Sequence, residues 1–167
     1  MDPVPIARTI RSGLEESAHL GDVAAVDRDG RLVASAGDPN RLLFARSSMK
    51  PLQATVSLSR APFPFTDREV AVMAASHNAE WIHLQAVRTI LARAELEEIH
   101  LQCPAMRPWD DAALDEDPVK RRINSDCSGK HAGMLAACRA QEWPLDSYRE
   151  PNHPLQQEIL RVVLAVT

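Results

Sequence analysis

The chain has 167 residues, of which 45% are hydrophobic and 25% charged, and its formal net charge is -4. This composition is ordinary for a globular domain, and the mixing of acids and bases along the chain excludes a basic surface for nucleic acid or a membrane. No apolar run approaches the roughly 20 residues that span a bilayer. The start MDPVPIARTI lacks the apolar core and cleavage site of a signal peptide. We therefore expect a cytoplasmic protein without nucleic-acid or membrane partners.

Four strands are predicted first, over residues 4–10, 14–20, 22–26 and 31–36. Asp29 and Gly30, between the last two strands, are a two-residue hairpin signal. Because tight turns join only antiparallel strands, we expect an antiparallel sheet.

Helices follow, over residues 47–59, 66–75, 81–94, 128–140 and 155–166. The second begins with a capping box from Thr66 to Glu69, and residues 106–122 are expected to form a loop with a short helix. A sheet followed by helices indicates an α+β fold, in one domain over residues 1–167. The last helix is apolar and has no stop signal, which predicts that further chain or a partner subunit packs against it.

A Ser-x-x-Lys pattern, Ser47 to Lys50, falls at the start of the first predicted helix. Residues three apart share a helix face, so the hydroxyl and the amine are expected within hydrogen-bond reach of each other. A serine becomes a nucleophile when a base takes its proton, and a lysine in its neutral form can be that base. The alternative is a capping serine followed by a surface lysine. Only three of the 19 basic residues are lysine, and arginine could not be deprotonated in this role.

Ser76 and Asn78 form a Ser-x-Asn at the end of the 66–75 helix. A Ser-x-Asn after a Ser-x-x-Lys is the order found in serine β-lactamases and transpeptidases, where the serine relays protons and the asparagine holds a substrate amide. The alternative reading of Asn78 is a helix C-cap.

Residues 124–131, NSDCSGKH, are polar and open an apolar helix, and such a helix start suits an anion or a carboxylate. The segment lacks the phosphate-binding pattern GxxxxGK[ST], because His131 stands where Ser or Thr is needed. Cys127 and Lys130 have metal-ligand spacing, although two groups do not complete a tetrahedral site. Three cysteines, Cys103, Cys127 and Cys138, argue against a disulfide framework.

Four blocks of the sequence resemble the bacterial type II L-asparaginases with a serine β-lactamase-like fold. They are RSSMKPLQA (46–54), ASHNAEWIH (75–83), SDCSGKHAGMLAAC (125–138) and NHPLQQEIL (152–160). The resemblance extends over essentially the whole chain, which it identifies as the N-terminal half of a larger domain. It departs from the family at Asn78 and Ala79, where a small residue and a glycine are usual.

The resemblance implies hydrolysis of L-asparagine to L-aspartate and ammonia. It implies Ser47 as nucleophile, Lys50 as base and Ser76 as proton relay, with Arg46 and His131 lining the pocket. It also suggests that Cys127 and Lys130 belong to a zinc site, although acyl transfer itself requires no cofactor.

We therefore expect an amidohydrolase that acts on a small-molecule amide. One alternative is another Ser-x-x-Lys acyl-transfer enzyme. Another is a truncated, catalytically inactive relative that serves as a binding or assembly partner, since a further catalytic lysine and a second zinc cysteine are expected in the other half. A homo-oligomer or an association with that half is expected, and little activity from this chain alone.

Overall fold

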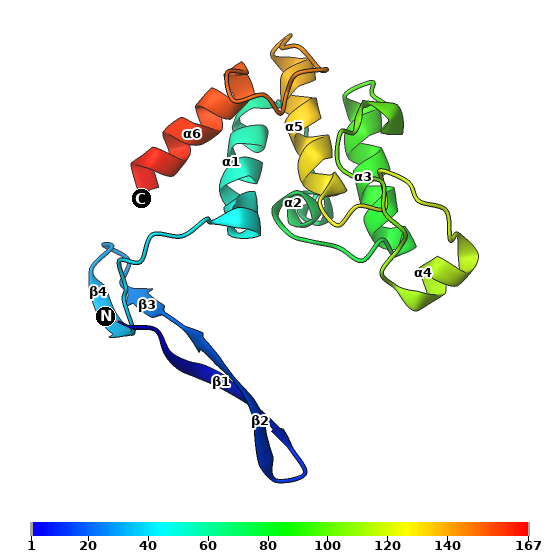
Figure 1. Ribbon diagram of the computed structural model, residues 1–167. Helices are drawn as coiled ribbons and strands as arrows, with labels where there is room; N and C mark the ends of the chain where they lie inside the picture. The colour runs from blue at the N-terminus through cyan, green and yellow to red at the C-terminus, as the bar shows by residue number, and fades with distance from the viewer. Residues whose placement is uncertain (1, 167) are drawn as a thin grey trace. The chain divides into compact units, whose positions relative to one another are not determined.

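Two β-hairpins come first in the chain, and helices make up the rest (Figure 1). The computed structural model describes residues 2–166. The chain divides into two units, Met1–Phe44 and Ala45–Thr167, and each is described by itself.

The first unit contains two antiparallel ribbons of two strands each. Strand β1 (Val4–Arg11) pairs with β2 (Leu14–Gly21), and β3 (Val23–Val26) pairs with β4 (Leu32–Ala36). Ser12 and Gly13 connect the first pair with φ angles of 50° and 80°, the positive values that a tight hairpin turn requires. The four predicted strands are thus confirmed, as two separate ribbons.

The turn between β3 and β4 is longer than the two residues expected at Asp29 and Gly30. The backbone N–H of Asp27 donates to the carbonyl of Arg31 at 2.9 Å, so three residues form the loop. The Asp27 carboxylate accepts from the N–H groups of Asp29 and Arg31 at 2.8 and 2.9 Å, and Gly30 has a φ of 78°. The two-residue turn was wrong because the aspartate side chain takes over the inner backbone donors and stabilises a wider loop.

The second unit is helical. A 3-10 turn, η1 (Arg46–Met49), leads into α1 (Lys50–Arg60), and a short 3-10 turn, η2 (Glu98–His100), follows α3. The other helices are α2 (Asp67–Ala74), α3 (Trp81–Arg93), α4 (Asp111–Glu116), α5 (Ser128–Ala140) and α6 (Pro154–Val166). The predicted helices and the short helix in the 106–122 loop are confirmed, except that residues 47–49 form a 3-10 turn before α1. Within residues 2–166, small antiparallel sheets and six α-helices make the fold α+β.

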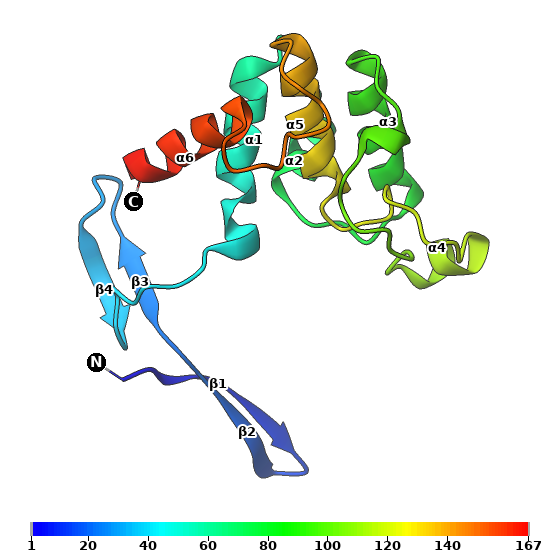
Figure 2. The same ribbon diagram turned by 45° about the horizontal axis from the view of Figure 1, so that its top comes forward.

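Helix α5 is the centre of the second unit. It lies between α1 and α3 in both views and also packs against α2 (Figures 1 and 2). A helix surrounded in this way has to be apolar or small on all sides, and every residue of α5 from His131 to Cys138 is buried.

Two glycines allow α2 to approach α5 closely. A Cβ atom added at Gly129 would lie 2.2 Å from the carbonyl oxygen of Val72, and one at Gly133 would lie 2.8 Å from Sδ of Met73. The glycines of the 125–138 block therefore permit the contact between these helices.

The capping box that begins α2 is present as predicted. Thr66 Oγ1 accepts from the Glu69 N–H at 3.3 Å, and the Glu69 carboxylate accepts from the Thr66 N–H at 2.6 Å. Glu69 is 3% exposed and also pairs with Arg93 of α3 at 3.2 Å, so the cap ties α2 to α3.

Helix α6 packs its inner side through the buried Leu155 and Ile159 and leaves Leu160, Leu164 and Val166 exposed. The partner expected to cover this helix stays a prediction. None of the helices described within residues 2–166 combines the length and apolar character needed to cross a membrane.

Candidate active site

The Ser-x-x-Lys motif spans the junction between the 3-10 turn η1 and helix α1. Ser47 lies in the turn and Lys50 is the first residue of α1. Pro51 follows, in the first turn of the helix, where its missing N–H has no partner to lose. Ser47 is exposed, whereas Lys50 is only 3% exposed, so the two side chains of the motif have different environments.

The ammonium group of Lys50 reaches across to the ends of two other segments. Nζ donates to Oγ of Ser76 at 2.8 Å, to the carbonyl of Ala75 at 3.3 Å and to the carbonyl of Asp126 at 3.4 Å, with the Asp126 carboxylate at 4.0 Å. These three acceptors match the three N–H groups of an ammonium. The structure thus brings Lys50 and Ser76 together, as the proposed relay needs.

Ser47 takes no part in this cluster. The expected hydrogen bond between the Ser47 hydroxyl and the Lys50 amine is not among the hydrogen bonds of residues 2–166. The neighbouring Ser48 hydroxyl donates to the carbonyl of Ala45 instead. Because residues 46–49 form a 3-10 turn and Lys50 is drawn inward to Ser76, the one-turn spacing does not produce the direct contact.

His77 holds the segment after Ser76 onto the start of α5. Its Nδ1 accepts from the Ala79 N–H at 3.2 Å, so Nε2 carries the proton and donates to Oγ of Ser128 at 2.9 Å. Ser128 donates in turn to the carbonyl of Ile123 at 2.8 Å. Burial, with a smaller contribution from the nearby His83, lowers the pKa of His77 to about 4, so the ring is neutral at pH 7. Sequence reasoning did not single out His77 or Ser128.

Asn78 and Arg46, both predicted to bind substrate, lie at turns. The carbonyl of Asn78 accepts from the N–H groups of Trp109 and Asp110 at 3.0 and 3.1 Å, which fixes the loop before α4. The C-cap of α2 is Ala75, so Asn78 does not cap that helix. Arg46 is exposed and has a φ of 50°, at the start of the turn that carries Ser47.

Cys127 precedes the first residue of α5 and is surrounded by hydrogen-bond donors. The neighbouring Cys103, with help from His131 and Ser125, lowers the pKa of Cys127, whose Sγ is 3.2 Å from Ser125 Oγ; the Cys103 thiol itself donates to the carbonyl of Arg122 at 3.1 Å. The same pairing raises the pKa of Cys103. Of these two neighbouring cysteines, Cys127 is therefore the one that ionises more readily.

Lys130 and His131 follow on the first turn of α5. Burial lowers the pKa of Lys130, and the charge of Lys50 adds to this lowering. Burial also lowers the pKa of His131, whose Nδ1 is 2.7 Å from the hydroxyl of Tyr148.

Cys127 and Lys130 supply two candidate donors for zinc, one turn apart. Across the described part of the chain, residues 2–166, His, Cys, Asp and Glu side chains nowhere gather in a group of three or more that could hold a metal ion. The residues present do not by themselves complete a zinc site, and zinc stays a prediction on which no step below depends.

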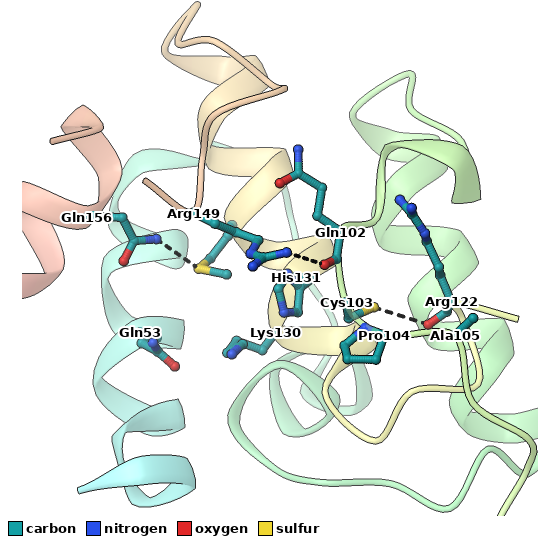
Figure 3. A pocket seen from close by; sticks show the side chains of 11 residues that line it. Gln53, Gln102, Cys103, Pro104, Ala105, Arg122, Lys130, His131, Arg149 and Gln156 are labelled. Atoms are coloured by element: carbon teal, nitrogen blue, oxygen red, sulfur yellow. Dashed lines mark hydrogen bonds between the residues drawn. The ribbon is translucent and has the colours of Figure 1, made fainter. Parts of the chain in front are cut away.

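A cavity of about 650 Å³ opens beside Lys130 and His131 (Figure 3). Its walls come from α1, α5, α6 and the loops that precede α4, α5 and α6. The lining residues are Gln53, Gln102, Cys103, Pro104, Ala105, Arg122, Lys130, His131, Met134, Arg149 and Gln156. We call it the cationic cavity because it carries two arginines and a lysine and no carboxylate.

Comparison with known proteins gives one family. The model of the family described as L-asparaginase II matches residues 7–167, nearly the full chain. No curated protein matches the chain closely enough to count as a relative.

Proposed function

This chain belongs to the L-asparaginase II family, and we propose that its site hydrolyses the side-chain amide of L-asparagine to L-aspartate and ammonia. Ser47 is the proposed nucleophile, Lys50 the base and Ser76 the proton relay. The observation that carries the proposal is the position of the buried Lys50 Nζ, 2.8 Å from the Ser76 hydroxyl. Lys50 begins α1, and Ser47 lies three residues before it in the 3-10 turn η1.

The proposed reaction runs through an ester. Ser47 Oγ attacks the amide carbon while its proton passes to Lys50 in its neutral form. The C–N bond breaks, and the proton passes from Lys50 through Ser76 to the departing nitrogen, which leaves as ammonia. Water then attacks the ester, giving aspartate and returning the proton to Ser47.

The surroundings of Lys50 define what this mechanism requires. Its Nζ donates to Ser76, Ala75 and Asp126, and the mechanism requires that Nζ give up one proton before Lys50 can act as a base. Ser76 is the neighbour able to pass that proton on, because a hydroxyl both donates and accepts.

A second candidate function is favoured by the position of Ser47. Ser47 is exposed, and within residues 2–166 its hydroxyl has no hydrogen bond with the Lys50 amine, as expected for an inactive relative that serves as a binding or assembly partner. Transfer of an acyl group from another amide or ester to the same Ser47 is the alternative within enzymes.

Ammonia release and trapping of the acyl intermediate would distinguish these candidates. The intact chain would be incubated with L-asparagine, quenched in acid and analysed by mass spectrometry for an aspartyl ester on Ser47. We expect Ser47→Ala to remove the adduct, Ser76→Ala to slow ammonia release about 100-fold or more as a proton-transfer role implies, and Ser48→Ala to behave as wild type. An adduct on another residue would overturn the assignment of the nucleophile. An adduct on Ser47 with little ammonia would match the low activity expected of this chain alone, whereas neither ammonia nor adduct from the folded wild-type chain would support the inactive relative.

A further inference from the structure

The amine of Lys50 lies where two segments of the chain meet. Ala75 and Ser76 belong to the segment that leaves α2, and Asp126 belongs to the loop that leads into α5. Nζ donates to both segments, at 2.8 and 3.3 Å to the first and at 3.4 Å to the second. A displacement of one segment relative to the other would therefore separate Lys50 from the Ser76 hydroxyl or from the Asp126 carbonyl.

His77 ties these two segments together at two points. Its backbone N–H donates to the carbonyl of Asp126 at 3.2 Å, and this is the carbonyl that also accepts from Lys50. Its ring Nε2 donates to Oγ of Ser128 at 2.9 Å. Both side chains of this second bond are buried, so water does not compete for it.

The direction of the ring bond is fixed at both ends. Nδ1 of His77 accepts from the Ala79 N–H at 3.2 Å, which leaves the proton on Nε2. The Ser128 hydroxyl donates to the carbonyl of Ile123 at 2.8 Å, so its oxygen is available to accept. The His77 ring also stacks on the ring of His83, with centroids 5.5 Å apart and an interplanar angle of 22°. A ring held on three sides has little freedom to rotate, so it fixes the backbone that carries it.

We propose that His77 and Ser128 are positioning residues that hold the Ser76 hydroxyl against the amine of Lys50. The close contact between α2 and α5 is at Val72, a full helical turn before Ser76, and it leaves the chain beyond α2 to be fixed by other bonds. The proposal rests on the proposed function for the role of Ser76 as a relay, whereas the tie between the two segments does not depend on that role.

Competitive acetylation measures how firmly Lys50 is held, and it needs no turnover. The intact chain is treated with a trace of acetic anhydride, and peptide mapping by mass spectrometry compares the labelling rate of the buried Lys50 with that of the exposed Lys120. His77→Asn keeps an acceptor for the Ala79 N–H but is too short to reach Ser128, whereas His77→Gln places a donor near the position of Nε2.

The three variants should differ in the way that the hydrogen bond predicts. We expect His77→Asn and Ser128→Ala to label Lys50 about tenfold or more faster than the wild type, as the loss of a buried hydrogen bond implies. His77→Gln should stay within about threefold of the wild type, because it restores the donor.

His153 and Ser57 supply matched controls. His153 is buried and makes the same pair of bonds elsewhere, since Nδ1 accepts from the Leu155 N–H at 3.1 Å and Nε2 donates to the carbonyl of Pro144 at 3.0 Å. Ser57 is a buried serine whose hydroxyl donates to a carbonyl within α1. His153→Asn and Ser57→Ala should therefore leave the labelling of Lys50 unchanged. Circular dichroism confirms that each variant is folded.

Several results would overturn the proposal. Unchanged labelling of Lys50 in Ser128→Ala would mean that the packing of α2 on α5 is enough to hold Ser76, and this variant decides alone if His77→Asn does not fold. Labelling in His77→Gln as fast as in His77→Asn would remove the role given to the Nε2 donor. Equal acceleration in the two control variants would show a general loosening of the helical unit.

Turnover separates this proposal from the proposed function. If the wild-type chain hydrolyses L-asparagine, His77→Asn should lower kcat about tenfold or more at an unchanged KM, and His77→Gln should restore most of it. An unchanged kcat in His77→Asn would refute the positioning role alone. A wild-type chain that forms neither ammonia nor an adduct, with labelling of Lys50 as expected, would refute the proposed function and support the tie between the segments.

Discussion

Replacing Gly129 with alanine should destabilise the helical unit, although alanine is the better helix former. The new Cβ would lie 2.2 Å from the carbonyl oxygen of Val72, 2.7 Å from its carbonyl carbon and 2.9 Å from its Cγ2. Backbone atoms cannot rotate away, so α2 and α5 have to separate. Alanine gains about 1 kcal/mol in helix propensity, whereas overpacking costs about 1–3 kcal/mol or more. With a backbone clash at the upper end of that range, we expect a net loss of about 2 kcal/mol in the free energy of unfolding.

Gly133→Ala is the matched control on the same helix. Its Cβ would meet Sδ and Cγ of Met73 at 2.8 and 3.0 Å, and a methionine side chain can rearrange where a backbone cannot. The propensity gain then offsets most of the packing cost, so its stability should stay within about 1 kcal/mol of the wild type.

Urea unfolding followed by circular dichroism at 222 nm would measure both variants, with the midpoint and slope fitted together. Because the two changes share the same chemistry and helix, their difference isolates the clash with the α2 backbone. A Gly129→Ala chain as stable as the Gly133→Ala chain would refute the reasoning. It would mean that α2 moves away from α5 at no cost, and that the position of Ser76, just beyond α2, does not depend on this contact.

Three further outcomes are expected. Glu69→Ala removes the α2 capping box and leaves Arg93 without its buried partner. Thermal and urea unfolding should therefore show a decrease of about 2–3 kcal/mol in the free energy of unfolding. A decrease below about 0.5 kcal/mol would contradict the role given to the buried Glu69. The fold lowers the pKa of His77 to about 4, so His77 takes up its proton in the unfolded chain at a higher pH than in the folded chain. The free energy of unfolding is therefore unaffected by His77 above pH 6.5 and decreases as the pH falls from 6.5 toward 4, by up to about 3 kcal/mol. The urea midpoint should decrease as the pH falls across this range, and it should decrease less steeply in His77→Gln than in the wild type. An equal dependence on pH in the two chains would exclude His77 as the cause. Iodoacetamide should label Cys127 first and Cys138 last, because neighbouring groups lower the pKa of the partly exposed Cys127, whereas burial raises the pKa of Cys138 to about 12. Peptide mapping that finds Cys138 modified first would contradict this order.

Local signals predicted most of the secondary structure. The strands and helices were found because alternating or helical apolar spacing, the Thr66 capping box and Pro51 act within a few residues of one another. The turn after β3 was the local failure, since the Asp27 side chain competes for backbone donors in a way that the Asp29–Gly30 pair does not reveal.

The candidate site was only partly accessible in this way. The motif spacing indicated Lys50 and Ser76, but the contact between them and the outward position of Ser47 depend on how η1 joins α1 and how closely α2 meets α5. Gly129 and Gly133, four residues apart, were the available signal for that close approach.

The sequence by itself indicated the approximate positions of the helices and strands, the Ser-x-x-Lys pattern and the resemblance to the L-asparaginases. Tertiary structure alone decided which distant groups share a space: Gln53, Lys130, Arg149 and Gln156 come from three helices and a loop and meet in one cavity. The physical reason is that elements form from interactions between near neighbours in the chain, whereas a site forms where packed elements bring together residues that no spacing rule relates.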